Sequence, residues 1–201
     1  MQKRRLNTRA MIMMAMLGAI AAVLMLLEIS VPFVLPFVKL DFSDLPILLS
    51  GYLFGPALGA ITACIKILLK LVLKPTSTMY VGELSNLILA IAFEAVASAY
   101  YRRHRTKKGA VLSLIISTIM TSVIAVVSNM FVIFPFYIKM FKMSMAGIVA
   151  MAHGVAPWVN SSLSMFLTSV FPFNLLKYGL VSLITFLIYK PLGNIIKRYI
   201  Q

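Results

Sequence analysis

The sequence predicts an all-α integral membrane protein with six transmembrane helices and with both chain ends in the cytoplasm. Two properties of the composition support this fold class. Of the 201 residues, 61% are hydrophobic and only 12% are charged, and the mean hydropathy is +0.98, which is far too apolar for a soluble domain of this size. The apolar residues also form long runs that short basic clusters separate, as expected of spans and their flanks.

Membrane topology explains the basic balance of the chain. Lys and Arg number 19 against 5 Asp and Glu, which gives a formal net charge of +14. Nucleic-acid-binding proteins also have such a charge, but here the basic residues flank apolar runs, where they meet anionic lipid headgroups. We therefore expect the lipid bilayer, and no nucleic acid, as a partner. The single cysteine, Cys64, lies in an apolar run, so no disulfide framework is expected.

Four apolar runs have the length of a membrane span, which is about 20 residues. They cover residues 10–27, 82–101, 109–134 and 173–196. The first run is longer than the apolar region of a signal peptide and lacks an A-x-A cleavage site, so we expect it to be retained. The segment 44–74 is long for one crossing and short for two, and Pro56 interrupts its helical hydrogen bonding.

The distribution of basic residues favours two crossings in this segment, over residues 44–55 and 57–73. With one crossing, the basic N-terminus and the basic loop after residue 101 would face opposite sides, contrary to the positive-inside rule. The C-terminal cluster also falls inside if the connection 135–172 makes no net crossing. The basic residues concerned are Lys3, Arg4, Arg5 and Arg9, then Arg102, Arg103, Arg105, Lys107 and Lys108, and finally Lys190, Lys197 and Arg198. We expect one transmembrane domain, 1–201.

Two long connections are predicted on the outer side. Residues 28–46 contain three prolines and are expected to form a structured loop and not one continuous helix. In the connection 135–172, the portion 143–157 is apolar but interrupted by glycine and proline, which suits an interfacial or lid helix.

Five polar side chains on three spans are predicted to lie at one depth, near the outer surface. They are Glu83, Asn86, Asn129, Asn174 and Lys177. Polar groups inside a membrane are functional candidates by default. Structural explanations also exist: Lys177 can extend to the headgroups, the asparagines can join helices, and Glu83 can pair with Lys66 or Lys70.

The residue types indicate the kind of ligand. Asparagine both donates and accepts hydrogen bonds while lysine only donates, so the set fits a neutral or weakly anionic ring rich in heteroatoms. Apolar and aromatic side chains nearby are expected to sandwich such a ring, although outer tyrosines are also ordinary interface residues. The candidates are Phe37, Leu40, Phe42, Tyr80, Phe173 and Tyr178.

Enzyme signatures are weak. The two histidines form no H-E-x-x-H pattern, and no G-x-x-x-x-G-K-[ST] phosphate loop occurs, so ATP hydrolysis by this chain and a bound cofactor are not expected. Asp44 is expected to cap the following helix. Two other classes of function stay open beside ligand binding. One is a membrane-embedded lipid-modifying enzyme that uses Asp41, Asp44 and Glu83 with a divalent metal, and the other is a small pore.

A stripe of small residues marks the first span. Ala15, Ala19 and Ala22 share one helix face, and Gly18 and Ala22 have small-x-x-x-small spacing, which permits close helix packing in lipid. The packing partner is either another helix of this chain or a separate subunit.

Together these features resemble the substrate-binding (S) component of energy-coupling factor (ECF) vitamin transporters, most closely the riboflavin-specific kind. The resemblance covers nearly the whole chain. It is carried by the small-residue first span, "KLDFSDLP" followed by "FGPALG", "GELSN", Asn129 and "NLLK".

The resemblance implies high-affinity capture of riboflavin, as the transported substrate, and its transfer across the bacterial plasma membrane. It implies a transmembrane coupling subunit and two cytoplasmic ATPase subunits as partners, and the S component would topple in the membrane to release its cargo. Glu83, Asn129, Asn174 and Lys177 match the positions that bind the hydrophilic edge of the flavin, and Leu40 and Phe42 those that supply apolar contacts. Ala15, Ala19 and Ala22 match the surface that meets the coupling subunit. An S component for another vitamin or heterocycle is the nearest alternative.

Overall fold

The computed structural model describes residues 8–200, with side chains described for residues 8–188. The predicted basic residues Lys3, Arg4 and Arg5, and the side chains of Lys190, Lys197 and Arg198, lie outside this description. The elements are α1 (Thr8–Leu26), β1 (Ile29–Ser30), β2 (Lys39–Leu40), α2 (Asp44–Phe54), α3 (Pro56–Leu73), α4 (Val81–Arg103), α5 (Lys107–Ser128), the π-helix η1 (Asn129–Ile133), α6 (Phe134–Phe141), α7 (Met145–Val155), α8 (Ser162–Met165), the π-helix η2 (Phe166–Val170) and α9 (Phe171–Ile200).

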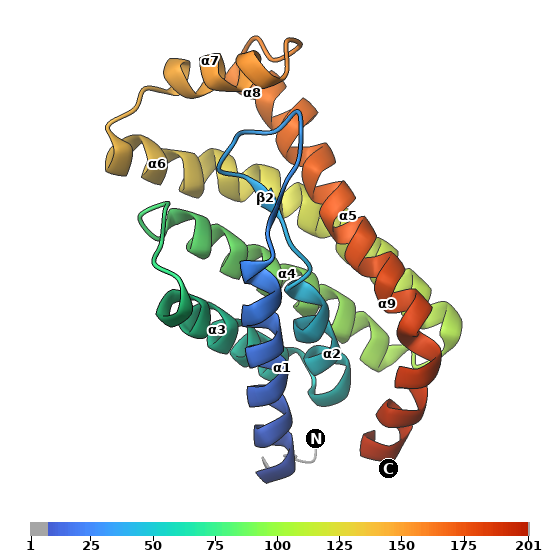
Figure 1. Cartoon of the computed structure of the whole chain (residues 1–201). Coiled ribbons are helices and arrows are strands. Elements are labelled where there is room, and N and C mark those ends of the chain that lie inside the picture. Colours follow the sequence, from blue (N-terminus) through green and yellow to red (C-terminus); the bar gives the residue numbers. More distant parts are fainter. Residues whose placement is uncertain (1–7, 201) are drawn as a thin grey trace.

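The chain is a helical bundle in which one end of the molecule carries α7 and the opposite end carries the start of α1 and the end of α9 (Figure 1). Among the described residues, five helical stretches are long and apolar enough to cross a membrane: Thr8–Leu26, Pro56–Leu73, Val81–Arg103, Lys107–Phe141 and Ser162–Ile188. The helix α2 has only 11 residues, so a sixth crossing and the cytoplasmic placement of both ends stay predictions.

The helix breaks between α2 and α3 at the place that the sequence indicated. Gly55 joins them with φ of 103° and ψ of 168°, a conformation that residues with a β-carbon rarely adopt. Pro56 then occupies the first turn of α3, where its missing N–H leaves no hydrogen bond unmade. As a result α2 and α3 form a hairpin that packs against α4.

Two helices extend further than the sequence suggested. The apolar runs were expected to end at residue 134 and to begin at residue 173, but α5 continues through η1 into α6, and α8 continues through η2 into α9. Pro135 and Pro172 each lie two residues after a π-helical segment. A π-helical segment changes the local hydrogen-bond register, and this explains how each helix passes a residue that lacks an N–H. Between these helices, α7 covers much of the segment expected to form an interfacial or lid helix.

Small side chains allow the central helices to approach closely. The buried face of α5 is built mainly from serine, threonine and alanine, among them Ser113, Ser117, Thr121 and Ala125, the residue types that favour helix contact in lipid. Large apolar side chains, such as Val72 and Leu187, are instead exposed on the outside of the bundle. An apolar outer surface of this kind suits a bundle surrounded by hydrocarbon.

The loop between α1 and α2, residues 27–43, is called the first loop below. It is not helical, and its strands β1 and β2 form a short antiparallel ladder that pairs Ile29 with Leu40 and Ser30 with Lys39. The second half of the loop contacts the helices α4 and α9, since Asp41 accepts hydrogen bonds from Asn86 and Lys177.

Candidate functional site

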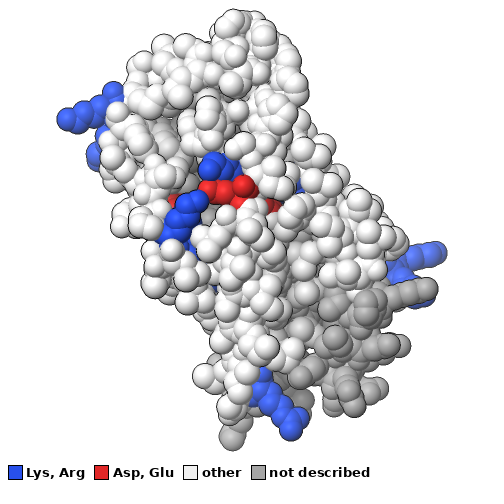
Figure 2. All heavy atoms as spheres, in the orientation of Figure 1, with Lys and Arg blue, Asp and Glu red and all other residues white. Residues whose placement is uncertain are grey.

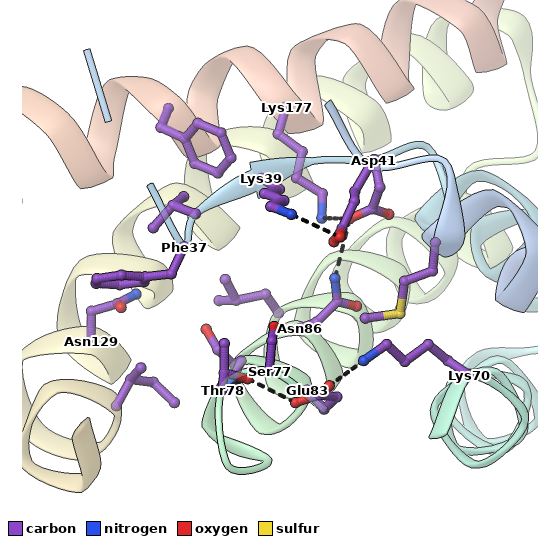
Figure 3. Close-up of a pocket in the computed structure, with 18 of the residues that line it drawn as sticks. Phe37, Lys39, Asp41, Lys70, Ser77, Thr78, Glu83, Asn86, Asn129 and Lys177 are labelled. Carbon is purple, nitrogen blue, oxygen red and sulfur yellow. Dashed lines mark hydrogen bonds and ion pairs between the residues drawn. The ribbon is translucent and has the colours of Figure 1, made fainter. Parts of the chain in front are cut away.

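A cavity lies between the first loop, the helices α3, α4, α6 and α9, and the π-helix η1. Figure 2 shows acidic and basic side chains gathered in one hollow of an otherwise mostly uncharged face, and Figure 3 shows the side chains that surround the cavity. The polar lining residues include Glu28, Lys39, Asp41, Lys70, Lys74, Ser77, Thr78, Glu83, Ser85, Asn86, Asn129, Asn174 and Lys177, and the aromatic ones are Phe37, Tyr137, Phe173 and Tyr178.

Four of the six predicted binding residues line this cavity: Glu83, Asn129, Asn174 and Lys177. They come from α4, the start of η1, and α9, so the fold brings together residues that are up to 94 positions apart in sequence (83 to 177). Their assembly in one cavity is the geometric condition that the hypothesis of a common binding site required.

Leu40 and Phe42 do not line the cavity, in contrast to the sequence-based expectation. Leu40 is buried elsewhere, and Phe42 packs against the core formed by α2, α4, α5 and α9. In an extended segment, successive side chains point to opposite sides, and over residues 39–42 it is Lys39 and Asp41 that line the cavity. The expected aromatic residue Tyr80 is exposed instead.

Lys177 is held in a buried ion network that consists of Asp41, Asp44, Lys66 and Lys177. Its Nζ lies 3.0 Å from Oδ2 of Asp41 and 3.3 Å from Oδ2 of Asp44. The exposed fractions of the four residues are 4%, 1%, 0% and 5%, in that order. Lys177 therefore points into the protein and not toward lipid headgroups (Figure 3), which argues against the explanation that it only extends to the membrane surface.

The other lysine of the network is fully paired. Lys66 Nζ lies 3.0 Å from Asp44 Oδ1 and 3.1 Å from Ser43 Oγ, and it also donates to the side-chain oxygen of Asn86. An ammonium group has three N–H donors, so these three contacts use all of them. Since two aspartates face two lysines, the charges of the ion network cancel.

Asp41 is the acceptor at the centre of the network. Its Oδ1 accepts from the backbone N–H of Ser43 at 2.9 Å and from the Ser43 hydroxyl, and its Oδ2 accepts from Lys177 at 3.0 Å and from Asn86 Nδ2 at 3.3 Å. Burial by itself raises the pKa of the carboxyl, but the charges of Lys177 and Lys66 outweigh it and lower the pKa from 3.8 to about 2. Asp41 is consequently ionised at neutral pH.

Glu83 belongs to a second polar group, on another side of the cavity (Figure 3). It forms an ion pair with Lys70, which is one of the two pairings expected from the sequence. Its Oε2 accepts from the hydroxyls of Thr76 at 2.9 Å and Thr78 at 3.0 Å. These donors fix the carboxylate in one orientation at the start of α4.

Asn129 and Asn174 are oriented by their own helices. Nδ2 of Asn129 donates to the carbonyl of Ala125 at 2.7 Å, and Nδ2 of Asn174 donates to the carbonyl of Val170 at 2.8 Å. Asn129 begins η1 and Val170 ends η2, and π-helical segments occur frequently at functional sites. Each amide has a second N–H and an oxygen with which it can recognise a ligand.

The rim of the cavity carries a partly exposed ion pair cluster. Oε1 of Glu28 lies 2.9 Å from Nζ of both Lys39 and Lys74. Partial burial raises the pKa of Glu28, but the hydrogen bonds from the two lysines outweigh it and lower that pKa. These contacts join the first loop to the end of α3.

The carboxylates do not converge on a metal site. Asp41 and Asp44 face lysines of the ion network, while Glu83 faces Lys70. In the described part of the chain, no three His, Cys, Asp or Glu side chains are grouped so that they can hold a metal ion.

The predicted small-residue surface divides in two. Ala15 and Ala19 are exposed on α1, whereas Ala22 is fully buried within the chain, and Gly18 packs closely against Ile65 of α3. The Gly18 and Ala22 side of the stripe therefore serves packing inside this chain, whereas Ala15 and Ala19 stay on its outer surface.

Sequence reasoning missed two features of the site. Tyr137 lines the cavity and packs on Phe37 with ring centroids 4.8 Å apart, but it lies beyond the predicted end of its span. The pairing of Lys177 with Asp41 joins residues 136 positions apart. The sequence did contain one signal for this pair. Only 5 acidic residues occur beside 19 basic ones, so an acid in an apolar context such as Asp41 is expected to pair with a lysine.

Comparison with known proteins places the chain among transport components. The family model described as "ECF transporter, substrate-specific component" matches residues 9–189. The chain is 32% identical to "Riboflavin transporter RibU" of Staphylococcus aureus over 98% of both chains. It is 29% identical to the protein of the same name from Streptococcus thermophilus, over 96% of this chain and 86% of that one.

One more riboflavin transporter and one solved structure are also similar to the chain. The chain is 27% identical to "Riboflavin transporter FmnP" of Bacillus subtilis over 66% of this chain and 70% of the relative. A solved structure described as the S component of a bacterial ECF transporter superimposes with a TM-score of 0.73 at 31% identity, covering 94% of this chain and 98% of the other.

Proposed function

Because this chain belongs to the substrate-specific components of ECF transporters, we propose that it captures riboflavin at the outer face of the bacterial cell membrane and carries it inward. It is a multi-pass membrane protein, and riboflavin is its transported substrate and not a cofactor. The observation that carries the proposal is the cavity, in which amides, hydroxyls and a buried lysine face aromatic walls. The riboflavin transporters to which the chain is similar support the choice of substrate.

Different polar residues of the cavity are assigned to different parts of riboflavin. Riboflavin has a planar ring with carbonyl and nitrogen acceptors at one edge and a chain of hydroxyl groups. We assign Lys177, Asn174 and Asn129 to the hydrophilic edge of the ring, because they supply N–H donors and amide oxygens. Glu83 is expected to accept hydrogen bonds from ligand hydroxyls, and Phe37 and Phe173 to cover the faces of the ring.

Transport needs partners that provide the energy. Membership of the family implies association with the remaining ECF module. We propose that this module consists of a transmembrane coupling subunit and two cytoplasmic ATPase subunits. The exposed alanines Ala15 and Ala19 on α1 are the proposed contact with the coupling subunit, because small residues permit close helix approach.

The other classes of function have less support. A lipid-modifying enzyme was considered because Asp41, Asp44 and Glu83 offered carboxylates for a metal, but each of the three forms an ion pair with a lysine. The family and the named relatives are transport components and not enzymes.

The test is a titration of the ligand-free, detergent-purified protein with riboflavin, followed by flavin fluorescence. We expect saturable quenching at about one riboflavin per chain, because a ring enclosed between aromatic side chains loses its emission. Thiamine and biotin, added in excess as matched competitors, should leave the quenching unchanged. Unaltered flavin fluorescence would reject riboflavin, and binding of a competitor would favour an S component for another vitamin.

A further inference from the structure

Asp41 lines the cavity but has little capacity left for a ligand. A carboxylate accepts about four hydrogen bonds, and Asp41 already accepts from the Ser43 backbone, the Ser43 hydroxyl, Asn86 and Lys177. Its side chain is 5% exposed. A direct role as the ligand's acceptor is therefore poorly suited to its contacts.

Lys177 has the opposite arrangement. Its ammonium donates to Asp41 at 3.0 Å and forms an ion pair with Asp44 at 3.3 Å, and the residue lines the cavity, so donor capacity is left for a ligand. The side chain of lysine is a flexible four-carbon stem. Its Nζ keeps a defined position because two carboxylates that are themselves fixed hold it.

Asp41 and Lys177 come from different elements of the fold. Asp41 belongs to the first loop and Lys177 to α9, and Figure 3 shows their side chains meeting at the cavity wall. Asp44 also pairs with Lys66 of α3. The position of the ammonium thus depends on the first loop being seated on the bundle.

From these contacts we infer that Asp41 is a positioning residue: it holds the ammonium of Lys177 at the cavity wall and acts on riboflavin through Lys177. The inference rests on the proposed function. The neutral charge balance of the ion network means that Lys177 offers a directed N–H donor and not an uncompensated positive charge, which suits the uncharged carbonyl and nitrogen edge of the flavin ring.

A double-mutant cycle on riboflavin affinity tests this inference. Asp41→Asn is expected to weaken binding by roughly 10- to 100-fold in the otherwise unchanged protein, because the ammonium loses a buried, charged partner. In the Lys177→Met background the same substitution should change affinity by less than about 3-fold, because residues that act as a unit are not additive.

A spectral readout separates positioning from a general loss of structure. The visible absorption band of flavin bound to Asp41→Asn should differ from that of the wild type, since a donor at the ring edge has moved. Asp41→Glu, which keeps the charge, should restore part of the affinity. The matched control is Glu94→Gln, which alters another buried acid away from the cavity and should keep the affinity and the band of the wild type.

Equal weakening by Asp41→Asn in both backgrounds would overturn the inference and leave the proposed function intact, because Asp41 would then act independently of Lys177. If Asp41→Asn does not fold, the cycle is run with Asp41→Glu and judged by the same criterion. A wild-type protein that does not bind riboflavin would overturn the proposed function and this inference together, so the two failures are distinguishable.

Discussion

The ion network and Glu94 are two buried polar regions of one bundle. The carboxylates of the ion network are paired with lysines, whereas the Glu94 carboxyl has no such partner in the described part of the chain. Asp41 and Asp44 pair with Lys177 and Lys66, within 3.0 to 3.3 Å. Glu94 of α4 is also fully buried, yet neither of its carboxyl oxygens has a hydrogen-bond partner among the described side chains. A charged carboxylate in such a place is costly.

The surroundings of Glu94 explain how the bundle accommodates it. Its carboxyl packs where Gly51 of α2 and Gly59 of α3 lack a side chain, and any β-carbon at either position would overlap it. Glu94 is thus held by shape, and we expect it to be uncharged, while the ion network is held by paired charges. The comparison teaches that this bundle accommodates buried acids in two ways, by paired charges in the ion network and, at Glu94, by a close fit without partners among the residues described.

The largest effect is expected from breaking the ion network at Lys66. Lys66→Met leaves Asp44 with one cation fewer in a buried position, so the free energy of unfolding should fall by about 3 to 5 kcal/mol. Denaturant unfolding in detergent measures it. The control Lys74→Met, which breaks a partly exposed pair, should cost no more than about 1 kcal/mol. An equal loss of unfolding free energy in the two variants would show that the buried pair stabilises the fold no more than the partly exposed pair does.

The next largest effect concerns riboflavin binding by Lys177. Lys177→Met should raise the riboflavin Kd by roughly 10- to 150-fold, equivalent to about 1.5 to 3 kcal/mol for a hydrogen bond from a charged donor. Fluorescence titration measures it, with Lys139→Met, an exposed lysine on α6, as the control. An unchanged Kd would mean that Lys177 serves only the ion network and does not contact riboflavin.

Acid should weaken the ion network through Asp41. Its pKa in the folded protein is about 2, below the ordinary 3.8, so its stabilisation is present above pH 3.8 and is lost as the pH falls toward 2. The pKa difference corresponds to about 2 kcal/mol. Unfolding measured across this interval should show the loss in the wild type and lack it in Asp41→Asn. The same acid dependence in both proteins would assign the effect to other groups.

The smallest effect is expected at Glu94. Glu94→Gln exchanges one neutral, unpaired polar group for another of similar shape, so the free energy of unfolding should change by less than about 1 kcal/mol. The measurement is the same denaturant unfolding. A loss as large as that of Lys66→Met would mean that Glu94 is charged and paired, and the contrast between the two regions would fail.

The sequence was informative where the signal is local. Apolar runs indicated the main helices, the Gly55-Pro56 pair indicated the break between α2 and α3, and the polar residues at one predicted depth indicated five side chains of the cavity. Each of these follows from the chemistry of a few adjacent residues or from the thickness of the membrane.

Features that depend on tertiary contacts were not predictable in the same way. The continuation of two helices past Pro135 and Pro172 requires π-helical segments, which no simple periodicity reveals. The side of the first loop that faces the cavity depends on its register, so Leu40 and Phe42 were expected at the cavity, which Lys39 and Asp41 line instead. Glu94 was overlooked because a single acid in an apolar run has no local pattern.

The central claim is that riboflavin binds in the cavity beside the ion network and accepts a hydrogen bond from Lys177. The most direct measurement is the visible absorption spectrum of the protein purified in detergent from cells supplied with riboflavin, for the wild type beside Lys177→Met. We expect a flavin spectrum in the wild type and little or none in the variant. A colourless wild-type protein, or equal flavin content in both, would contradict the claim.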